Sequence, residues 1–164
     1  MNKKFRKGSM IQAAGTLFLS VQTKRFLLLM RDDDSYNNTW ATVGGRAEMG
    51  ETVIESLSRE IIEEIGFLPL VRKTIPIDLF ASNDGKFEFH TFICLVDKEF
   101  IPNLNNEHNG YAWSSVNGFP KPLHPALHNA LKNHTLKTKI ENILQLLEVS
   151  ETDELIEVDR FIIR

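Results

Sequence analysis

Three glutamates in one predicted helix are the residues of this chain best placed to do chemistry. The spacing puts the three on one side of a helix: Glu60 lies three positions before Glu63 and four before Glu64. Because a helix turns by about 100° per residue, the three side chains share an arc of about 100°. Like charges at these spacings destabilise a helix unless something neutralises them. Carboxylate oxygens are the ligands that hard divalent cations such as Mg²⁺ and Mn²⁺ prefer. The spacing therefore predicts a divalent-cation site, against the alternative of a solvated acidic face.

The segment before this helix has the composition of a loop that holds a ligand closely. Gly44, Gly45 and Gly50 let the backbone bend tightly and approach a bound group. Glu48 and Glu51 add two more carboxylates within the same few residues. This context favours a cation site over a solvated face.

The helix has clear boundaries in the sequence. Thr52 followed three positions later by Glu55 is a capping box, and Gly66 stands where a left-handed residue ends a helix. We expect its buried face to consist of the apolar residues that recur at helical spacing, namely Ile54, Leu57, Ile61 and Ile65. The acidic arc is then on the opposite side.

The residues from Gly45 to Phe67 resemble the Nudix box. Gly45 is followed after five residues by Glu51, and after seven more by the run Arg59-Glu60-Ile61-Ile62-Glu63-Glu64-Ile65-Gly66-Phe67. No gap or substitution occurs at the defining positions, and the motif is long enough to make a chance match improbable. The resemblance implies a Nudix fold and a MutT-like hydrolase of pyrophosphate bonds, and the order of the flanking strands extends it to about residue 131.

The resemblance also implies a cofactor and its ligands. Mg²⁺ is the implied cation, with Mn²⁺ as the alternative. Glu60, Glu63 and Glu64 are implied to bind it, and the carbonyl oxygen of Gly45 to complete the site. Glu107, which precedes Trp113 by six positions, matches a further acidic ligand that many members carry in a loop before a Trp. The alternative for this residue is an ordinary surface glutamate in an Asn-rich loop.

Hydrolysis of a pyrophosphate bond fits this set of residues. The anionic link repels hydroxide, so the reaction needs cations that neutralise its oxygens and hold an acidified water in line with phosphorus. A carboxylate must then accept the proton of that water. We expect Glu63 or Glu64 to be this base, with Glu107 as the rival. The resemblance further implies that Arg59 pairs with Glu51 and fixes the loop against the helix.

Three further residues are candidates for binding the substrate. Arg31 and Arg46 are placed to hold a phosphate by charge-assisted hydrogen bonds, although a solvated Arg is the commoner case. Trp40 is a candidate for stacking on a base, and so is Phe80, but core packing is the favoured role for both.

Two departures from the family pattern concern the loop and the substrate. Val43 stands where many members have a Pro before the double glycine, and we expect altered backbone geometry there rather than lost catalysis. Residues 82–85 contain neither the Pro nor the Tyr that marks subfamilies acting on ADP-ribose or dinucleoside polyphosphates. These markers therefore leave the substrate open.

The chain has the composition of one ordinary globular domain. Its 164 residues are 42% hydrophobic and 25% charged, which argues against disordered and fibrous classes. A net charge of −3 gives no reason to expect a nucleic-acid partner. The one cysteine, Cys94, is expected to be buried and fits a reducing compartment, and no run reaches the ~18 apolar residues that span a membrane. We expect a cytoplasmic protein, because the basic residues 1–7 and the fairly apolar residues 10–21 lack the clean cleavage site of a signal peptide.

The predicted elements come in the order strands, helix, strands, helix. The predicted strands are residues 11–21, 26–31, 68–81, 87–96 and 111–116. Strict β-α-β alternation is absent, and the step Asp84-Gly85 predicts a hairpin turn. We therefore predict the α/β (α+β) class, as a Nudix-like α/β/α sandwich with a mixed, largely antiparallel sheet and a loop-helix-loop catalytic motif.

The C-terminal part predicts two more helices. Pro125 is placed to start one, and apolar residues from Leu136 to Leu147 form a stripe on another. We treat residues 1–164 as a single domain with a C-terminal helical extension from about 135–164. A basic stretch followed by an acidic one near the C-terminus leaves a homodimer open, with packing of the helix on its own domain as the favoured arrangement.

These features together predict Mg²⁺-dependent hydrolysis of a pyrophosphate bond in a nucleoside diphosphate linked to another moiety, with ADP-ribose as the first substrate to test. Two alternatives stay open: a Nudix-fold module that senses a nucleotide without turnover, and a nucleoside triphosphate pyrophosphohydrolase. Sensing modules usually lose a carboxylate of the box, whereas this chain retains all of them, which favours an enzyme. The expected partner is a small-molecule nucleotide, with no membrane and no nucleic acid.

Overall fold

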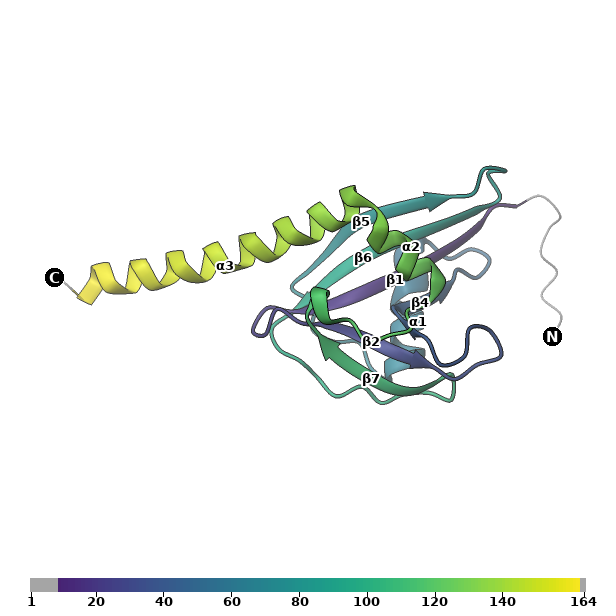
Figure 1. Cartoon of the computed structure of the whole chain (residues 1–164), viewed down its shortest axis with the longest axis horizontal. Helices are drawn as coiled ribbons and strands as arrows, with labels where there is room; N and C mark the ends of the chain where they lie inside the picture. Colours follow the sequence, from purple (N-terminus) through teal and green to yellow (C-terminus); the bar gives the residue numbers. More distant parts are fainter. Residues whose placement is uncertain (1–8, 163–164) are drawn as a thin grey trace.

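A seven-stranded sheet with helices on both faces forms the body of the protein (Figure 1). The computed structural model describes residues 9–162, with side chains up to residue 150. In chain order the elements are β1 (Ile11–Ser20), β2 (Phe26–Arg31), β3 (Trp40–Ala41), β4 (Val43–Arg46), α1 (Val53–Ile65), β5 (Lys73–Ala81), β6 (Phe87–Val96), β7 (His108–Ser114), a short 3-10 helix (Val116–Gly118), α2 (Pro125–Lys132) and α3 (His134–Ile162). The predicted α/β sandwich is confirmed.

The sheet is mixed because its two long central strands run parallel. β1 and β6 pair from Ile11 opposite Phe87 to Ser20 opposite Val96. The other strand pairs are antiparallel. The main strand order is β3-β2-β1-β6-β5, with β7 paired to β2 and β4 paired to β1. The predicted mixed, largely antiparallel sheet is therefore observed.

Two apolar cores lie on the two faces of the sheet. The face covered by α1, called here the α1 face, buries Phe18 of β1 against Ile61 of the helix. The opposite face, called the α2 face, buries Leu17 of β1 together with Leu127 of α2 and the start of α3. Successive side chains of a strand point to opposite faces, so β1 supplies its even-numbered residues to one core and its odd-numbered residues to the other.

α1 begins and ends where the sequence predicts. The Thr52 hydroxyl accepts a hydrogen bond from the Glu55 N–H at 3.2 Å, and the Glu55 carboxylate accepts one from the Thr52 N–H at 2.8 Å. Gly66 ends the helix with a φ of 83°, a left-handed conformation that glycine adopts at little cost. The predicted capping box and the predicted C-terminal glycine are both present.

The predicted buried face of α1 is wrong at its first residue. Ile54 is 51% exposed, and Val53 packs against the core in its place. The buried residues of the helix are Ser56, Leu57, Ile61, Glu64 and Ile65. The buried stripe is therefore rotated from the predicted one, and the rotation takes Glu64 into the interior.

Strand boundaries differ from the prediction in two places. β5 begins at Lys73 rather than at residue 68, and β7 begins at His108 rather than at residue 111, because the residues before Tyr111 continue the pairing with the end of β2. The predicted turn is present, with Gly85 at a φ of 67°. β5 also contains a bulge between Pro76 and Asp78.

Only the first part of α3 packs on the body. Leu136 and Ile140 are buried in the core of the α2 face, and the Lys139 Nζ donates a hydrogen bond to the carbonyl of Ile77 at 2.9 Å. Beyond this contact Leu146 is 66% exposed, and the helix projects past the edge of the sheet (Figure 1). The favoured packing of α3 on its own domain is observed for this first part, and a homodimer stays a prediction.

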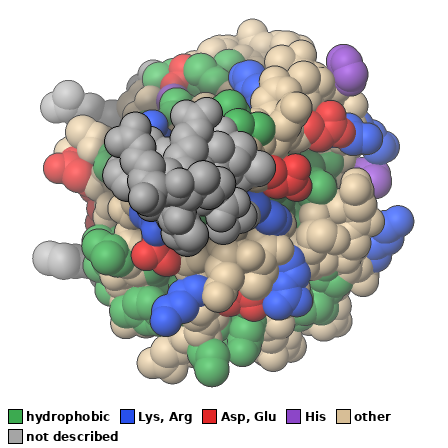
Figure 2. Space-filling model, turned by 90° about the vertical axis from the view of Figure 1, so that its left-hand side faces the viewer, with side chains coloured by type: hydrophobic (Ala, Val, Ile, Leu, Met, Phe, Trp, Pro, Cys, Tyr) green, Lys and Arg blue, Asp and Glu red, His purple; other side chains and the backbone are tan. Residues whose placement is uncertain are grey.

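The surface seen from the α3 side mixes both signs of charge. Figure 2 shows Lys and Arg side chains interspersed with Asp and Glu on this face, without the broad basic area that binds nucleic acid by charge. No helix in the described part of the chain is long and apolar enough to cross a membrane. Residues 1–7, on which the signal-peptide argument rests, lie outside the described residues.

Candidate active site

Arg59 links the loop before α1 to the carboxylates of the helix. Its Nε and Nη2 donate hydrogen bonds to the two carboxylate oxygens of Glu51 at 2.7 and 3.1 Å, and Nη2 also donates to the carbonyl of Arg46 at 2.9 Å. Its Nη1 donates to Glu60 at 2.8 Å and to Glu63 at 3.2 Å. Two parallel bonds between an Arg and a carboxylate fix geometry as well as charge. The expected Arg59–Glu51 pair is present, and the same guanidinium restrains two further carboxylates.

Glu60 lies directly against the backbone of Gly45. A Cβ atom added to Gly45 would come within 2.5 Å of the carboxylate carbon of Glu60, so only a glycine leaves room for this carboxylate. The Glu60 side chain is 14% exposed. Burial raises the pKa of its carboxyl, and the guanidinium of Arg59 opposes that rise. The strand and the helix thus bring a largely buried carboxylate and a glycine backbone together.

Glu64 is the most deeply buried acidic residue of the site, with 5% of the residue exposed. Its carboxylate accepts a hydrogen bond from the backbone N–H of Gly44 at 2.9 Å, the one hydrogen bond recorded for it among the described residues. Burial, with the negative charges of Glu60 and Glu107, raises the pKa of its carboxyl to about 8, against the opposing effect of the Gly44 hydrogen bond. A positive charge beside this carboxylate would therefore be strongly favoured.

The other two predicted ligands are exposed. The Glu63 side chain is 54% exposed and has Arg59 as its partner. Glu107 lies in the loop before β7, close enough for its charge to raise the pKa of both Glu60 and Glu64. No three Asp, Glu, His or Cys side chains among the described residues form a ready-made metal cluster. In this conformation Glu60 and Glu63 bind Arg59 and Glu64 binds the backbone of Gly44, and the role of the helix glutamates as cation ligands stays a prediction.

The buried part of the site nevertheless fits a divalent cation. Glu60, Glu64 and the backbone of Gly45 offer carboxylate and carbonyl oxygens, the hard donors that Mg²⁺ and Mn²⁺ prefer. An acidic group buried with a single hydrogen bond is costly unless a cation or a proton neutralises it. The space left by the absent side chain of Gly45 is already used by the Glu60 carboxylate, which keeps that carboxylate beside the backbone.

A family comparison covers most of the fold. The family model described as the NUDIX domain matches residues 10–134, which include every strand of the sheet together with α1 and α2. The chain belongs to the Nudix family. It is accordingly a hydrolase that acts on pyrophosphate bonds, and Nudix hydrolases generally use divalent metal ions. α3 begins at the end of the matched region and adds to the Nudix domain.

Two curated relatives and a solved structure are similar to this Nudix chain. The chain is 31% identical over 120 residues to dihydroneopterin triphosphate diphosphatase of Haemophilus influenzae, a match to 64% of this chain and 74% of the relative. It is 30% identical over 73 residues to ADP-ribose pyrophosphatase of Methanocaldococcus jannaschii, a match to 44% and 43%. A MutT NUDIX hydrolase from Burkholderia pseudomallei superposes with a TM-score of 0.60 at 20% identity, over 77% of this chain and 99% of that chain. The structural likeness shows the Nudix fold.

Of the three predicted substrate residues of this Nudix chain, Arg31 is the one whose charge acts on a glutamate of the site among the described residues. Arg31, at the end of β2, forms an ion pair with Asp33, and its charge acts on the carboxyl of Glu64 by lowering the pKa. Arg46 ends β4, directly after the two glycines, and is exposed. Trp40 is elsewhere, because it packs against the core of the α2 face. This is the packing role that the sequence analysis favoured for Trp40.

A buried histidine opposite Arg31 was missed from the sequence. His108 is 8% exposed, and its Nδ1 lies 3.1 Å from the Oδ1 of Asn105. Burial and, second, the charge of Arg31 lower the pKa of its imidazole to about 4. A single His in a polar loop carries no signal of its own, and only the pairing of β7 with β2 places it opposite Arg31.

The predicted burial of two apolar residues outside the box is confirmed for one and wrong for the other. Cys94 is buried as predicted, with 2% exposed. Phe80 does not belong to the core, because 56% of it is exposed. The hairpin of β5 and β6 extends beyond the rest of the sheet (Figure 1), and Phe80 lies near its tip. The favoured core role of Phe80 is therefore wrong.

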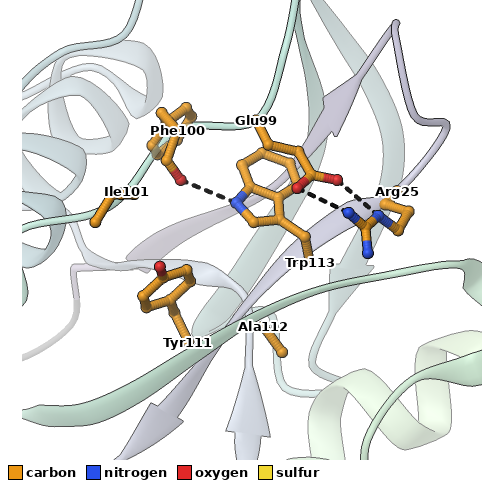
Figure 3. A pocket seen from close by; sticks show the side chains of 7 residues that line it. All are labelled: Arg25, Glu99, Phe100, Ile101, Tyr111, Ala112 and Trp113. Carbon is orange, nitrogen blue, oxygen red and sulfur yellow. Dashed lines mark hydrogen bonds and ion pairs between the residues drawn. The ribbon is translucent and has the colours of Figure 1, made fainter.

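A separate pocket opens at the other end of β2 and β7 (Figure 3). Its volume is 510 Å³, and its lining residues are Arg25, Glu99, Phe100, Ile101, Tyr111, Ala112 and Trp113. Arg25 donates to both carboxylate oxygens of Glu99, at 2.6 and 3.0 Å, and the Trp113 Nε1 donates to the carbonyl of Phe100 at 3.0 Å. None of the predicted site residues lines this pocket, so it is separate from the Nudix site.

Proposed function

We propose that this chain hydrolyses the pyrophosphate bond of a nucleotide in a reaction that depends on Mg²⁺, with Mn²⁺ as the second cation to test. The observation that carries the proposal is the contact between the Glu60 carboxylate and the Gly45 backbone. Glu64 lies buried on the same side of the strand and binds the neighbouring glycine. Glu63 and Glu107 are the exposed carboxylates proposed to complete the cation site.

Each residue of the site has its own role in the proposed reaction. Bound Mg²⁺ supplies neutralisation of the phosphate oxygens and acidification of a water molecule. Arg59 is a positioning residue, because it donates three hydrogen bonds to Glu51 and Glu60 and a fourth to the carbonyl of Arg46. Glu63 or Glu64 accepts the proton of the attacking water, with Glu107 as the rival, since each is a carboxylate at the site.

Two substrate classes follow from the relatives. A nucleoside diphosphate linked to another moiety, with ADP-ribose tested first, agrees with the name of the Methanocaldococcus jannaschii relative. A triphosphate is favoured by the longer match to dihydroneopterin triphosphate diphosphatase of Haemophilus influenzae. Arg31 and Arg46 are proposed to hold phosphate groups in either class, because a guanidinium binds phosphate oxygens through paired hydrogen bonds.

A substrate panel tests the proposal. ADP-ribose, other nucleotide sugars, the nucleoside triphosphates, dihydroneopterin triphosphate and dinucleoside polyphosphates are incubated with the full chain in Mg²⁺, in Mn²⁺ and in EDTA, and phosphate-containing products are separated. Cleavage of one class that EDTA abolishes is the expected result. Tight binding of a nucleotide with no cleavage of any substrate would contradict it and would make the chain a nucleotide sensor.

A further inference from the structure

We propose that β7 binds a second copy of this chain edge to edge, so that the two sheets join into one. The interface consists of residues 110–114 of β7 and the pocket beside them (Figure 3). In a contact of this kind backbone hydrogen bonds give affinity, and pockets for alternate side chains give specificity. The inference does not depend on the proposed function. It also differs from the homodimer through α3 that the sequence left open.

β7 is an outer strand with one open edge. It pairs with β2 alone in the described sheet. Within the described part of the chain, no hydrogen bond from any other segment reaches the backbone of residues 110–114. Their pairing with β2 is regular, and the register shifts only before them. These five residues include no charged residue and no proline, the features that usually prevent a further strand from adding to an edge.

The hydrogen bonds of β2 show which backbone groups of β7 face outward. The N–H of Arg31, at the end of β2, donates to the carbonyl of Thr39 at 3.0 Å, so its backbone groups face away from β7. Backbone groups alternate in direction along a strand, so the even-numbered residues of β2 bond to β7. These pair with the even-numbered residues of β7. The N–H and C=O groups of Tyr111 and Trp113 therefore point outward.

A second copy fits this edge when the twofold axis passes through Ala112. In that antiparallel pairing Tyr111 lies opposite the partner's Trp113, and each of the two resulting pairs exchanges two hydrogen bonds through the outward groups. Gly110 lies opposite the partner's Ser114, so the regular residues are matched along their whole length. Both copies use the same groups, as a twofold interface requires.

The pocket on the α1 face receives the partner's aromatic ring in this pairing. Trp113 packs against the core of the α1 face, and alternation places Tyr111, which is 39% exposed, on the same face. Directly opposite side chains have Cβ atoms about 5 Å apart, so the partner's Tyr111 reaches Trp113 and the 510 Å³ pocket that Trp113 lines. Ile101, which is 78% exposed, lines the same pocket and adds apolar surface. Aromatic pairs across strands stabilise such contacts.

The distribution of charge favours a second copy as the occupant of this edge. Like charges directly opposite one another destabilise a strand pair, and residues 110–114 bring none into the contact. Beside the strand, Arg25 and Glu99 neutralise each other through two hydrogen bonds at 2.6 and 3.0 Å. Two copies therefore approach along β7 without repulsion.

Sedimentation velocity of the full chain over a range of concentrations tests the inference. Five strand residues a side are fewer than the about 20–30 residues of a stable interface, so we expect a reversible dimer with a Kd on the order of 10 µM to 1 mM. Tyr111→Lys should raise the Kd at least about tenfold, because an edge Lys opposes strand addition and the aromatic pairs are lost. Leu79→Lys is the control, since it replaces a 56% exposed apolar residue on β5 and should dimerise as the wild type does.

Disulfide trapping tests the register. Ala112→Cys faces its own copy across the axis, in a pair without mutual hydrogen bonds whose Cα atoms lie about 4.5 Å apart, within disulfide range. Gly110→Cys is the matched control, because its two copies are about 14 Å apart along the strands and an added Cβ meets nothing closer than 3.4 Å. Cys94 is 2% exposed and gives little background. Mild oxidation should link Ala112→Cys and leave Gly110→Cys monomeric.

Three results would overturn the inference: a wild type that stays monomeric up to about 1 mM, a dimer that Tyr111→Lys leaves unchanged, or equal trapping of the two cysteine variants. The second result would mean that the dimer forms elsewhere, for example through α3. Tyr111→Lys changes an exposed side chain and keeps the test valid where Ala112→Cys fails to fold. Failure of the proposed function is a separate result, since none of these measurements involves turnover.

Discussion

The carboxylate of Glu64 accepts a hydrogen bond from the backbone N–H of Gly44 at 2.9 Å. This bond joins α1 to β4 at the point where the strand has no side chains. Glu64 is thereby held in the interior with a pKa of about 8, beside a second carboxylate, Glu60, that also lies against a glycine. The site thus concentrates acidic groups where water does not stabilise them, which is the condition under which a divalent cation binds most strongly.

Glu64→Gln should reduce turnover by roughly 100-fold or more, because it removes a buried charged ligand while keeping the size of the side chain. The fold should be retained. Steady-state kinetics in Mg²⁺ measure the effect, and circular dichroism checks the fold. Glu141→Gln, an exposed substitution on α3, is the control and should keep full activity. Near-normal turnover of Glu64→Gln would show that the metal site lies elsewhere.

In EDTA, the stability of the wild type should fall as the pH rises toward about 8. The Glu64 carboxyl has a pKa raised from 4.5 to about 8 in the folded protein, so the folded chain keeps a proton that the unfolded chain releases between these values. The contribution of this group to the free energy of unfolding is therefore largest below about pH 4.5. It decreases between pH 4.5 and pH 8 by on the order of a few kcal/mol. Urea unfolding from pH 5 to pH 9 measures the slope. Glu64→Gln should remove most of it, and parallel curves for the two proteins would contradict the assignment.

The caps of α1 and the box spacing could be predicted because both are encoded over a few neighbouring residues. The burial of Glu64 was not predicted because its charge suggested the polar side, although its position seven residues after Leu57 places it at the border of the apolar face. The contact that buries it depends on Gly44 and Gly45, whose lack of side chains lets the helix carboxylates reach the strand. Such a contact between distant segments has no periodic signal in either one.

Other predictions of burial were wrong for the same reason, because burial there depends on tertiary contacts. Val53 rather than Ile54 packs on the core. The two are neighbours of similar hydrophobicity, so only the rotation of the helix on the sheet decides which of them is buried. Phe80 has the composition of a core residue but lies near the end of a hairpin that extends beyond the cores. His108 becomes buried only when β7 pairs with β2.

Gly45→Ala should weaken metal binding and turnover together. The added methyl group would come within 2.5 Å of the Glu60 carboxylate carbon, so the carboxylate must move away from the backbone. We expect turnover to fall at least about tenfold and the Mg²⁺ concentration for half-maximal activity to rise, because the ligands of a cation site need close placement. Gly110→Ala is the matched control in a strand, since its nearest contact is 3.4 Å. Equal activation curves for the two variants would refute the role of the Gly45 contact.

Arg59→Lys should lower kcat by about tenfold although it keeps the charge, because a Lys cannot form the two parallel bonds to Glu51. Arg59→Ala should cost more turnover and also about 1–3 kcal/mol of unfolding free energy, as expected when a largely buried ionic network loses its centre. Kinetics and urea unfolding measure both. Arg25→Lys is the matched control, since Arg25 forms the same kind of pair with Glu99 away from the site. An equal fall in kcat for Arg25→Lys would mean that losing any paired Arg–carboxylate contact lowers kcat, and it would contradict a specific role of Arg59.

The bulge in β5 has a consequence for how copies of this protein behave together. β5 is the outer strand on its side of the sheet, and an outer strand with a regular row of unpaired backbone groups recruits strands from other chains. Here the row is interrupted between Pro76 and Asp78, and proline has no N–H to offer. The β5 border of the sheet is therefore a poor template for aggregation, so crowded copies of the chain should remain separate along it.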